Sequence, residues 1–166
     1  MEFEFGTNGN LIAKDARIIF RNFAGKESQF NPAGTRNFCL VLSDQAADEL
    51  TKKSWNVKKT RVRSPDDDPI YYISVAVKFG AYPPNVWLVS GKSKTQVTED
   101  IVSTLDSVEL ERVDVEIRPY TWSAAGKTGV KAYLKTMYAT IREDPFATQY
   151  RFDDEPKSND EEALPF

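Results

Sequence analysis

The chain has 166 residues, with 22 lysines and arginines, 25 aspartates and glutamates, one cysteine and no histidine. Its length suits one domain of ordinary size with a substantial core. Without histidine the chain lacks the commonest general base near neutral pH and the commonest zinc ligand, which disfavours enzymatic and zinc-dependent functions.

The N-terminal segment and the single cysteine indicate a cytoplasmic protein. Residues 1–5 carry no basic segment followed by an apolar stretch, and no apolar run approaches the length needed to cross a bilayer. Cys39 cannot form an intramolecular disulfide, and its apolar neighbours predict a small buried side chain rather than a nucleophile. No motif indicates a cofactor.

Apolar residues recur mostly with a period of two between turn residues, which is typical of an antiparallel β domain. Ser43 is expected to cap a helix that has acids early and lysines late, as the helix dipole favours. Thr98 is expected to cap a second, shorter helix. In chain order, the predicted elements are strands over 16–23 and 36–42, a helix over 44–53, strands over 70–79 and 85–89, a helix over 99–105, and strands over 108–122 and 130–141.

This order predicts a mainly β fold, a five-stranded OB barrel over residues 1–150 whose bottom is closed by the helix near 98–105. The helix over 44–53, together with residues 55–69, then forms an insertion between strands. A β-sandwich is the alternative, since counting strands does not separate the two folds. Trp87 and Tyr138 are expected to fill the core.

The last two predicted strands carry cations and aromatic rings on one face. Val113, Val115 and Ile117 suit a core, and strand alternation puts Arg118, Tyr120 and Trp122 on the other face. Sequence-tolerant binding of unpaired bases needs both cations along the phosphates and rings on which bases stack. The predicted ribbon consists of Arg118, Tyr120, Trp122, Lys127, Lys131, Tyr133 and Lys135.

A second group of candidates precedes this ribbon. Residues 55–63 hold the densest basic stretch of the chain, four cations behind one tryptophan. The first strand and the following loop add cations and rings at the place where an OB groove has a finger, and the third strand adds two outward residues. These candidates are Arg17, Arg21, Phe23, Phe30, Trp55, Lys58, Lys59, Arg61, Arg63, Tyr72 and Lys78.

The end of the chain is acidic. Residues 153–166 hold six acids and one lysine, a net −5, which leaves the other 152 residues with 21 bases and 19 acids. Such a segment has too few apolar residues to offset its ordering entropy, so residues 151–166 are predicted to be a disordered tail. Leu164, Pro165 and Phe166 form a compact apolar tip suited to a shallow pocket flanked by lysine or arginine. A merely solubilising tail is the alternative.

The residues Asp160-Glu-Glu-Ala-Leu-Pro165-Phe166 resemble the tails of the single-stranded DNA-binding proteins of bacteria and their phages, although Ala163 and Leu164 depart from the usual acidic run. The body also resembles a phage-encoded member of that family. The strings that carry this second resemblance are Arg21-Asn-Phe-Ala-Gly25, Arg36-Asn-Phe-Cys39, Ile117-Arg-Pro-Tyr120 and Lys127-Thr-Gly-Val-Lys-Ala-Tyr-Leu134.

The resemblance implies a non-enzymatic protein that coats single-stranded DNA in replication, recombination and repair, in the host cytoplasm if phage-encoded. It further implies that the tail tip recruits replication or recombination proteins and that the acidic run competes with DNA for the groove. No membrane partner is expected, and a homo-oligomer stays open.

Two other functions are alternatives to this one. In the first, the β domain is a protein–protein adaptor of a phage replication complex and the tail is its docking peptide. In the second, Asp66, Asp67 and Asp68 hold magnesium in a nuclease, although such a run is more often a solvated loop and a second carboxylate cluster is lacking. The triplets that begin at Gly91 and Gly126 resemble phosphate loops but lack the first glycine, so turns are expected there.

Overall fold

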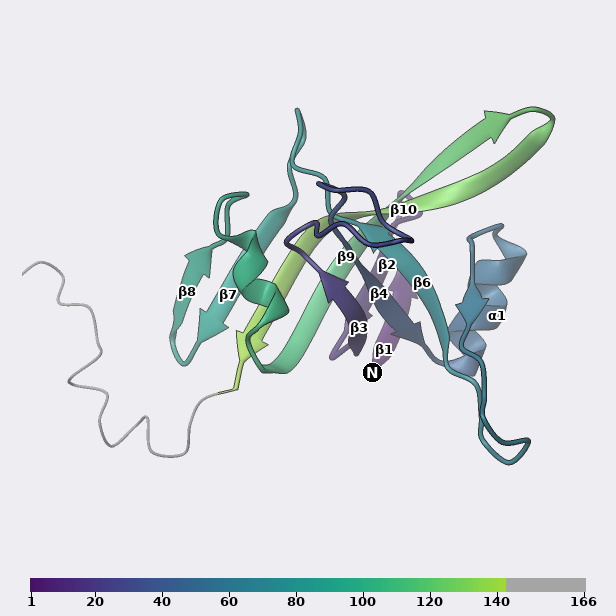
Figure 1. The fold of residues 1–166 in the computed structure, drawn as a ribbon, viewed down its shortest axis with the longest axis horizontal. Coiled ribbons are helices and arrows are strands. Elements are labelled where there is room, and N and C mark those ends of the chain that lie inside the picture. Colours follow the sequence, from purple (N-terminus) through teal and green to yellow (C-terminus); the bar gives the residue numbers. More distant parts are fainter. Residues whose placement is uncertain (143–166) are drawn as a thin grey trace, which may run out of the picture.

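The computed structural model describes residues 1–142, and the predicted tail lies outside this range. Residues 1–142 form a mainly β structure with one α-helix and one 3-10 helix (Figure 1). None of the helices in this part of the chain is long and apolar enough to cross a membrane. The elements are β1 (Glu2–Phe5), β2 (Leu11–Lys14), β3 (Ile18–Asn22), β4 (Asn37–Leu42), α1 (Asp44–Lys52), β5 (Lys58–Lys59), β6 (Tyr71–Ala76), β7 (Asn85–Ser90), β8 (Ser93–Gln96), η1 (Val102–Asp106), β9 (Leu110–Ala124) and β10 (Lys127–Ile141).

Six strands pair in the order of an OB barrel. The ladder runs β2–β9–β10–β6–β4–β3, and only β6 and β10 are parallel within it. Since β2 and β3 are successive parts of one bent segment, this segment borders both ends of the ladder. Two bonds hold the bend: Ala16 N donates to Val113 O at 2.8 Å, and Val41 N donates to Arg17 O at 2.9 Å. The predicted mainly β, OB-type fold is confirmed as a partly open barrel.

Four strands extend the sheet beyond this barrel. β1 pairs with β2, β5 pairs with β6, and β7 pairs with β8 and, in parallel, with β10. Only β7 was predicted, because the other three strands have two to four residues, too few for a periodicity to stand out, although Glu2–Phe5 does alternate between charged and apolar residues. β7 and β8 lie at one end of the molecule and α1 at the other (Figure 1).

The core follows the predicted alternation along β9. Val113, Val115 and Ile117 are buried, whereas the intervening residues are half-buried or exposed. β10 obeys the same alternation up to Leu134 and then shifts by one residue, because Lys135 is an extra residue in the ladder: Leu134 pairs with Ile117 and Thr136 with Glu116. Met137 and Ala139 are therefore buried, and Tyr138 faces outward.

The first predicted helix is confirmed as α1. The Ser43 hydroxyl oxygen accepts a hydrogen bond from Ala46 N at 3.1 Å, which is the expected N-cap contact. Ala46, Ala47 and Leu50 are buried, so one face of this short helix packs on the barrel.

The second helix differs from its prediction. It is the 3-10 helix η1, it starts later, and no side chain caps it. Thr98 lies too far ahead of its first turn, and its hydroxyl instead donates to the Asp100 carboxylate, which lowers the pKa of Asp100. Val102 and Leu105 of η1 are fully buried, so η1 covers part of the core as expected.

Candidate nucleic-acid interface

The ends of β9 and β10 continue beyond the barrel as a two-stranded arm (Figure 1). Residues 121–128 of this arm are all exposed. The arm turns at Ala125 and Gly126, whose φ angles are 53° and 79°, the positive values that a tight hairpin turn requires. The predicted loop residue Lys127 directly follows this turn and is exposed.

Trp122 lies across the arm on Gly129, its partner in register on β10. A Cβ atom at Gly129 would be only 2.7 Å from Cζ2 of Trp122, so the indole occupies the space that a side chain at position 129 would fill. Trp122 is 40% exposed. One side of the Trp122 indole therefore packs on Gly129, and much of the ring is exposed to solvent.

Tyr120 and Tyr133 form the second aromatic element of the arm. Their ring centroids are 6.2 Å apart in an edge-to-face arrangement. Arg118 Cζ lies 5.3 Å and Lys131 Nζ lies 5.5 Å from the centroid of Tyr133, both at cation–π distance. The sequence predicted that these outward residues share a surface, and they do.

A groove of about 640 Å³ separates the arm from the segment that follows α1. Trp122 and Lys131 line it from the arm, Lys58 lines it from β5, and Ser74 from β6 contributes to its floor. OB folds bind oligonucleotides on the outer face of their second and third barrel strands, together with the loop between the first and second strands and the loop between the fourth and fifth strands. The groove of this chain is lined by Thr35, Asn37, Ser54, Trp55, Asn56, Lys58, Ile73, Ser74, Ala76, Trp122, Thr128, Gly129, Val130, Lys131 and Ala132.

A smaller hollow of about 450 Å³ adjoins the tyrosine pair. Lys78 and Tyr82, from the loop after β6, line it together with Arg118, Tyr120 and Tyr133. Tyr82 is 91% exposed, and sequence reasoning had not selected it. The only sequence signal for it is the turn-forming context of Gly80, Pro83 and Pro84.

Six of the predicted cations have no carboxylate partner within residues 1–142; of these six, Lys58 and Lys131 line the groove, Arg118 lines the smaller hollow, and the other three line neither. Lys58, Lys59, Arg61, Arg63, Arg118 and Lys131 are exposed and take part in none of the ion pairs that the described residues form. Lys135 differs, because its Nζ lies 3.7 Å from Glu116 Oε2. Unpaired ammonium and guanidinium groups are available for phosphate oxygens.

Two aromatic candidates proved wrong because they are buried. Phe23 is fully buried and stacks on Phe38 with ring centroids 5.4 Å apart. Trp55 is only 6% exposed, and its backbone pairs with Val130 at the base of the arm. Neither ring can take a base on an open face, so both are core residues, although Trp55 also borders the groove.

The reason for the error at Phe23 is a bulge in β3. Pairing with β4 slips between Ile19 and Asn22, and Phe20 has a φ of 51°, an unusual value for a bulky residue. The slip turns Phe20 outward, 63% exposed, with its ring 5.9 Å from that of the half-buried Tyr72 in an edge-to-face pair. Sequence alternation gave no sign of Phe20, which adds a ring to the outer face.

Four other predicted site residues lie in different parts of the structure. Arg21 Nη1 donates to Leu105 O and Val108 O, each at 2.8 Å, so it joins β3 to the segment around η1 rather than facing DNA. Arg17 is exposed at the bend between β2 and β3. Phe30 is 87% exposed in the loop between β3 and β4, as expected of a finger residue. Lys78 is exposed as well.

Trp87 and Tyr138, expected in the core, form a stacked pair on the outer surface. Their centroids are 6.3 Å apart, and Tyr138 is 37% exposed. The extra residue Lys135 reverses the alternation on β10, and nothing in the residue pattern announces that reversal.

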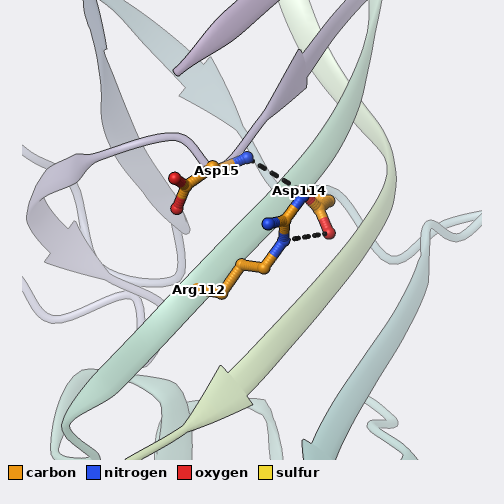
Figure 2. A network of polar contacts seen from close by, with 3 residues as sticks. All are labelled: Asp15, Arg112 and Asp114. Carbon is orange, nitrogen blue, oxygen red and sulfur yellow. Dashed lines mark hydrogen bonds and ion pairs between the residues drawn. The ribbon is translucent and has the colours of Figure 1, made fainter.

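Nearer the start of β9, on the same outer face as Arg118, Asp114 takes part in a polar network. Asp114 accepts hydrogen bonds from Asp15 N at 2.9 Å and from Arg112 Nε at 3.2 Å (Figure 2). The bond and the charge of Asp114 raise the pKa of Arg112. This network ties the bend after β2 to β9 and places negative charge away from the groove.

Two further predictions from the sequence concern the single cysteine and a possible metal site. Cys39 is half-buried, less than expected, and burial raises the pKa of its thiol although nearby Lys58 acts in the opposite direction. Asp66, Asp67 and Asp68 are exposed, and within residues 1–142 no three carboxylate or thiol side chains gather as metal ligands would.

Comparison with known proteins gives a family and a fold. The family model described as "Putative phage ssDNA-binding domain" matches residues 5–164. A comparison with curated proteins gives no match.

Three solved structures of the single-stranded DNA-binding protein from bacteriophage Enc34 are similar to this chain at 12% sequence identity. The complex of that protein with ssDNA has a TM-score of 0.54 and covers 84% of this chain and 90% of its own. Its C-terminal truncation gives 0.52 over the same shares, and a third structure gives 0.51 over 88% and 93%. At this identity the likeness concerns the fold.

Proposed function

Since the chain belongs to the family of phage single-stranded DNA-binding domains, we propose that it binds single-stranded DNA in the groove between the arm and the segment after α1. The observation that carries this proposal is that Trp122, Lys131 and Lys58 line the same groove. The bases stack on exposed rings, and the phosphates pair with cations that have no carboxylate partner in residues 1–142.

The binding is largely independent of sequence. Rings accept any base, and lysine or arginine on a phosphate carries no base information. Release of counterions then supplies much of the affinity, which falls with salt at a log–log slope of about −0.7 for each phosphate contacted. The protein coats and protects single strands in phage DNA replication, recombination or repair, within the host cytoplasm.

Residues 151–166 form an acidic tail that competes with DNA for the groove. The six acids and one lysine of residues 153–166 stand against residues 1–152 with a net charge of +2, so the tail and DNA compete for the same cations. The tip of the tail recruits replication or recombination proteins: Leu164, Pro165 and Phe166 bind an apolar pocket with basic edges on the partner protein.

An adaptor is the second candidate function, favoured by two exposed aromatic loop residues. Phe30 is 87% and Tyr82 is 91% exposed, and exposed rings at loop tips suit protein contacts as well as bases. An adaptor without DNA binding shows no change of tryptophan fluorescence on addition of oligothymidine.

The test is a fluorescence titration with oligothymidine at two salt concentrations, with the full chain and with a chain lacking residues 153–166. We expect quenching, weaker binding at the higher salt, and tighter binding of the shortened chain at the lower salt. A shortened chain that binds more weakly contradicts the competition, and a shortened chain that ignores oligothymidine contradicts the function.

A further inference from the structure

The outer surface has a second pair of aromatic rings, at the end of β10 remote from the arm. Trp87 of β7 and Tyr138 of β10 are partners in register, and their planes are 16° apart. Lys94 of β8 lies over both rings, with Nζ 4.7 Å from the centroid of Trp87 and 5.8 Å from that of Tyr138. The neighbouring residues Val86 and Met137 point to the other face and are fully buried. The core is thus filled without these rings.

The pair lies on the same outer surface of β10 as Tyr133. Leu134 and Met137 are buried, and the extra residue Lys135 between them keeps Tyr133 and Tyr138 on one side. From Tyr133 to Tyr138 the strand advances roughly 16 Å at about 3.3 Å per residue. At about 3.4 Å per stacked nucleotide this separation corresponds to roughly five nucleotides. β10 runs from the arm to β7 without interruption (Figure 1).

The acidic neighbours of this pair are already engaged. Asp114, the β9 partner of Tyr138, accepts bonds from Asp15 N and Arg112 Nε (Figure 2). Glu116 accepts a bond from Asn10 Nδ2 at 2.8 Å and faces Lys135. Lys94 is exposed and makes no ion pair within residues 1–142, so its ammonium group is available to an anion.

We infer that Trp87, Tyr138 and Lys94 form a second stacking site for the same DNA strand, reached along β10 from the arm. The inference rests on the proposed function. Two flat rings beside an exposed lysine provide what an unpaired nucleotide needs, a stacking surface and a phosphate contact. Lys94 moves from the rings to a phosphate when a base takes its place. Only strands long enough to pass Tyr133 reach the site.

The test compares two lengths of oligothymidine, about 4 and about 20 nucleotides, which extend roughly 14 and 70 Å when stacked, so that only the longer strand spans the distance from Tyr133 to Tyr138. The double variant Trp87→Thr/Tyr138→Thr keeps residues that suit strands. We expect it to bind the long strand about 5- to 150-fold more weakly than the unaltered chain, as loss of one stacked base does. Its affinity for the short strand stays within about twofold.

Lys94→Ala provides an independent readout that leaves both rings in place. Its log–log salt slope should be shallower by about 0.7 for the long strand alone. Lys52→Ala, on the outer side of α1, is the matched control and should change neither slope. Thermal unfolding of each variant separates loss of fold from loss of the site.

Unchanged affinity of the double variant for the long strand overturns the inference, and it is the result that a protein-docking patch predicts. Equal losses at both lengths also overturn it, as does an unchanged salt slope for Lys94→Ala. If the unaltered chain binds neither length, the proposed function itself is wrong.

Discussion

The β9–β10 hairpin has two halves built from the same two strands, and they differ in what lies behind them. In the barrel half, one face of each strand is buried, as Val115, Ile117, Leu134 and Met137 show. In the arm, residues 121–128 are exposed on both faces. Burial of apolar surface stabilises the fold, so the barrel half determines stability. The arm is free to serve a ligand.

The comparison also explains where the rings are useful. Trp122 rests on Gly129 and keeps an open side, whereas Trp55 lies at the base of the arm with almost no exposed surface. A ring with an open side can exchange solvent for a base, and a buried ring cannot. Changes in the arm should therefore alter binding, and changes in the barrel half should alter stability.

The largest expected effect is on stability in the barrel half. Ile117 is fully buried, so Ile117→Ala should lower the free energy of unfolding by about 2–5 kcal/mol. Chemical denaturation measures this change. Thr121→Ala, at an exposed position four residues further along β9, is the control and should change stability by less than about 0.5 kcal/mol. Similar losses at the two positions would remove the distinction between the halves.

The next effect is on binding in the arm. Trp122→Ala should weaken binding of oligothymidine by about 1–3 kcal/mol if the indole stacks on a base. Its unfolding free energy should stay within about 0.5 kcal/mol of the unaltered chain, because the ring packs on Gly129 and not in the core. Equilibrium titration and denaturation of one preparation measure both quantities. Full affinity in this variant would show that Trp122 takes no base.

The smallest expected effect concerns the contact between Trp122 and Gly129. Gly129→Ala places a methyl group where the indole lies, 2.7 Å from Cζ2, and should displace Trp122. Gly129 has no positive φ, so alanine is compatible with its backbone. We expect an affinity loss of roughly 0.5–1 kcal/mol that vanishes when Trp122 is already alanine, because neighbouring changes are not additive. Additive losses in the double variant would contradict the contact.

Sequence periodicity predicted most of this arrangement where the strands are regular. It put Val113, Val115 and Ile117 inside and Arg118, Tyr120 and Trp122 outside, and the structure agrees. Ser43 was found because an N-cap is a local property of a few residues.

The errors fall where tertiary contacts override local pattern. The bulge at Phe20 goes with anchoring of the following backbone, since Asp106 accepts bonds from Phe23 N at 2.7 Å and Ala24 N at 2.9 Å. These bonds join residues more than eighty positions apart, so no window around Phe23 contains them. The extra residue at Lys135 likewise depends on pairing with β9, and it exposes Tyr138.

In the proposed complex, cations that form no ion pair within residues 1–142 contact phosphates from both walls of the groove, and the salt dependence of binding measures these contacts. The double variant Lys58→Ala/Lys131→Ala removes one cation from each wall. Its log–log slope for oligothymidine should be shallower by about 1.4, or about 0.7 for each lost contact. The control Lys14→Ala/Lys52→Ala, at exposed positions outside the groove, should keep the slope of the unaltered chain. An unaltered slope for the groove variant would contradict these contacts.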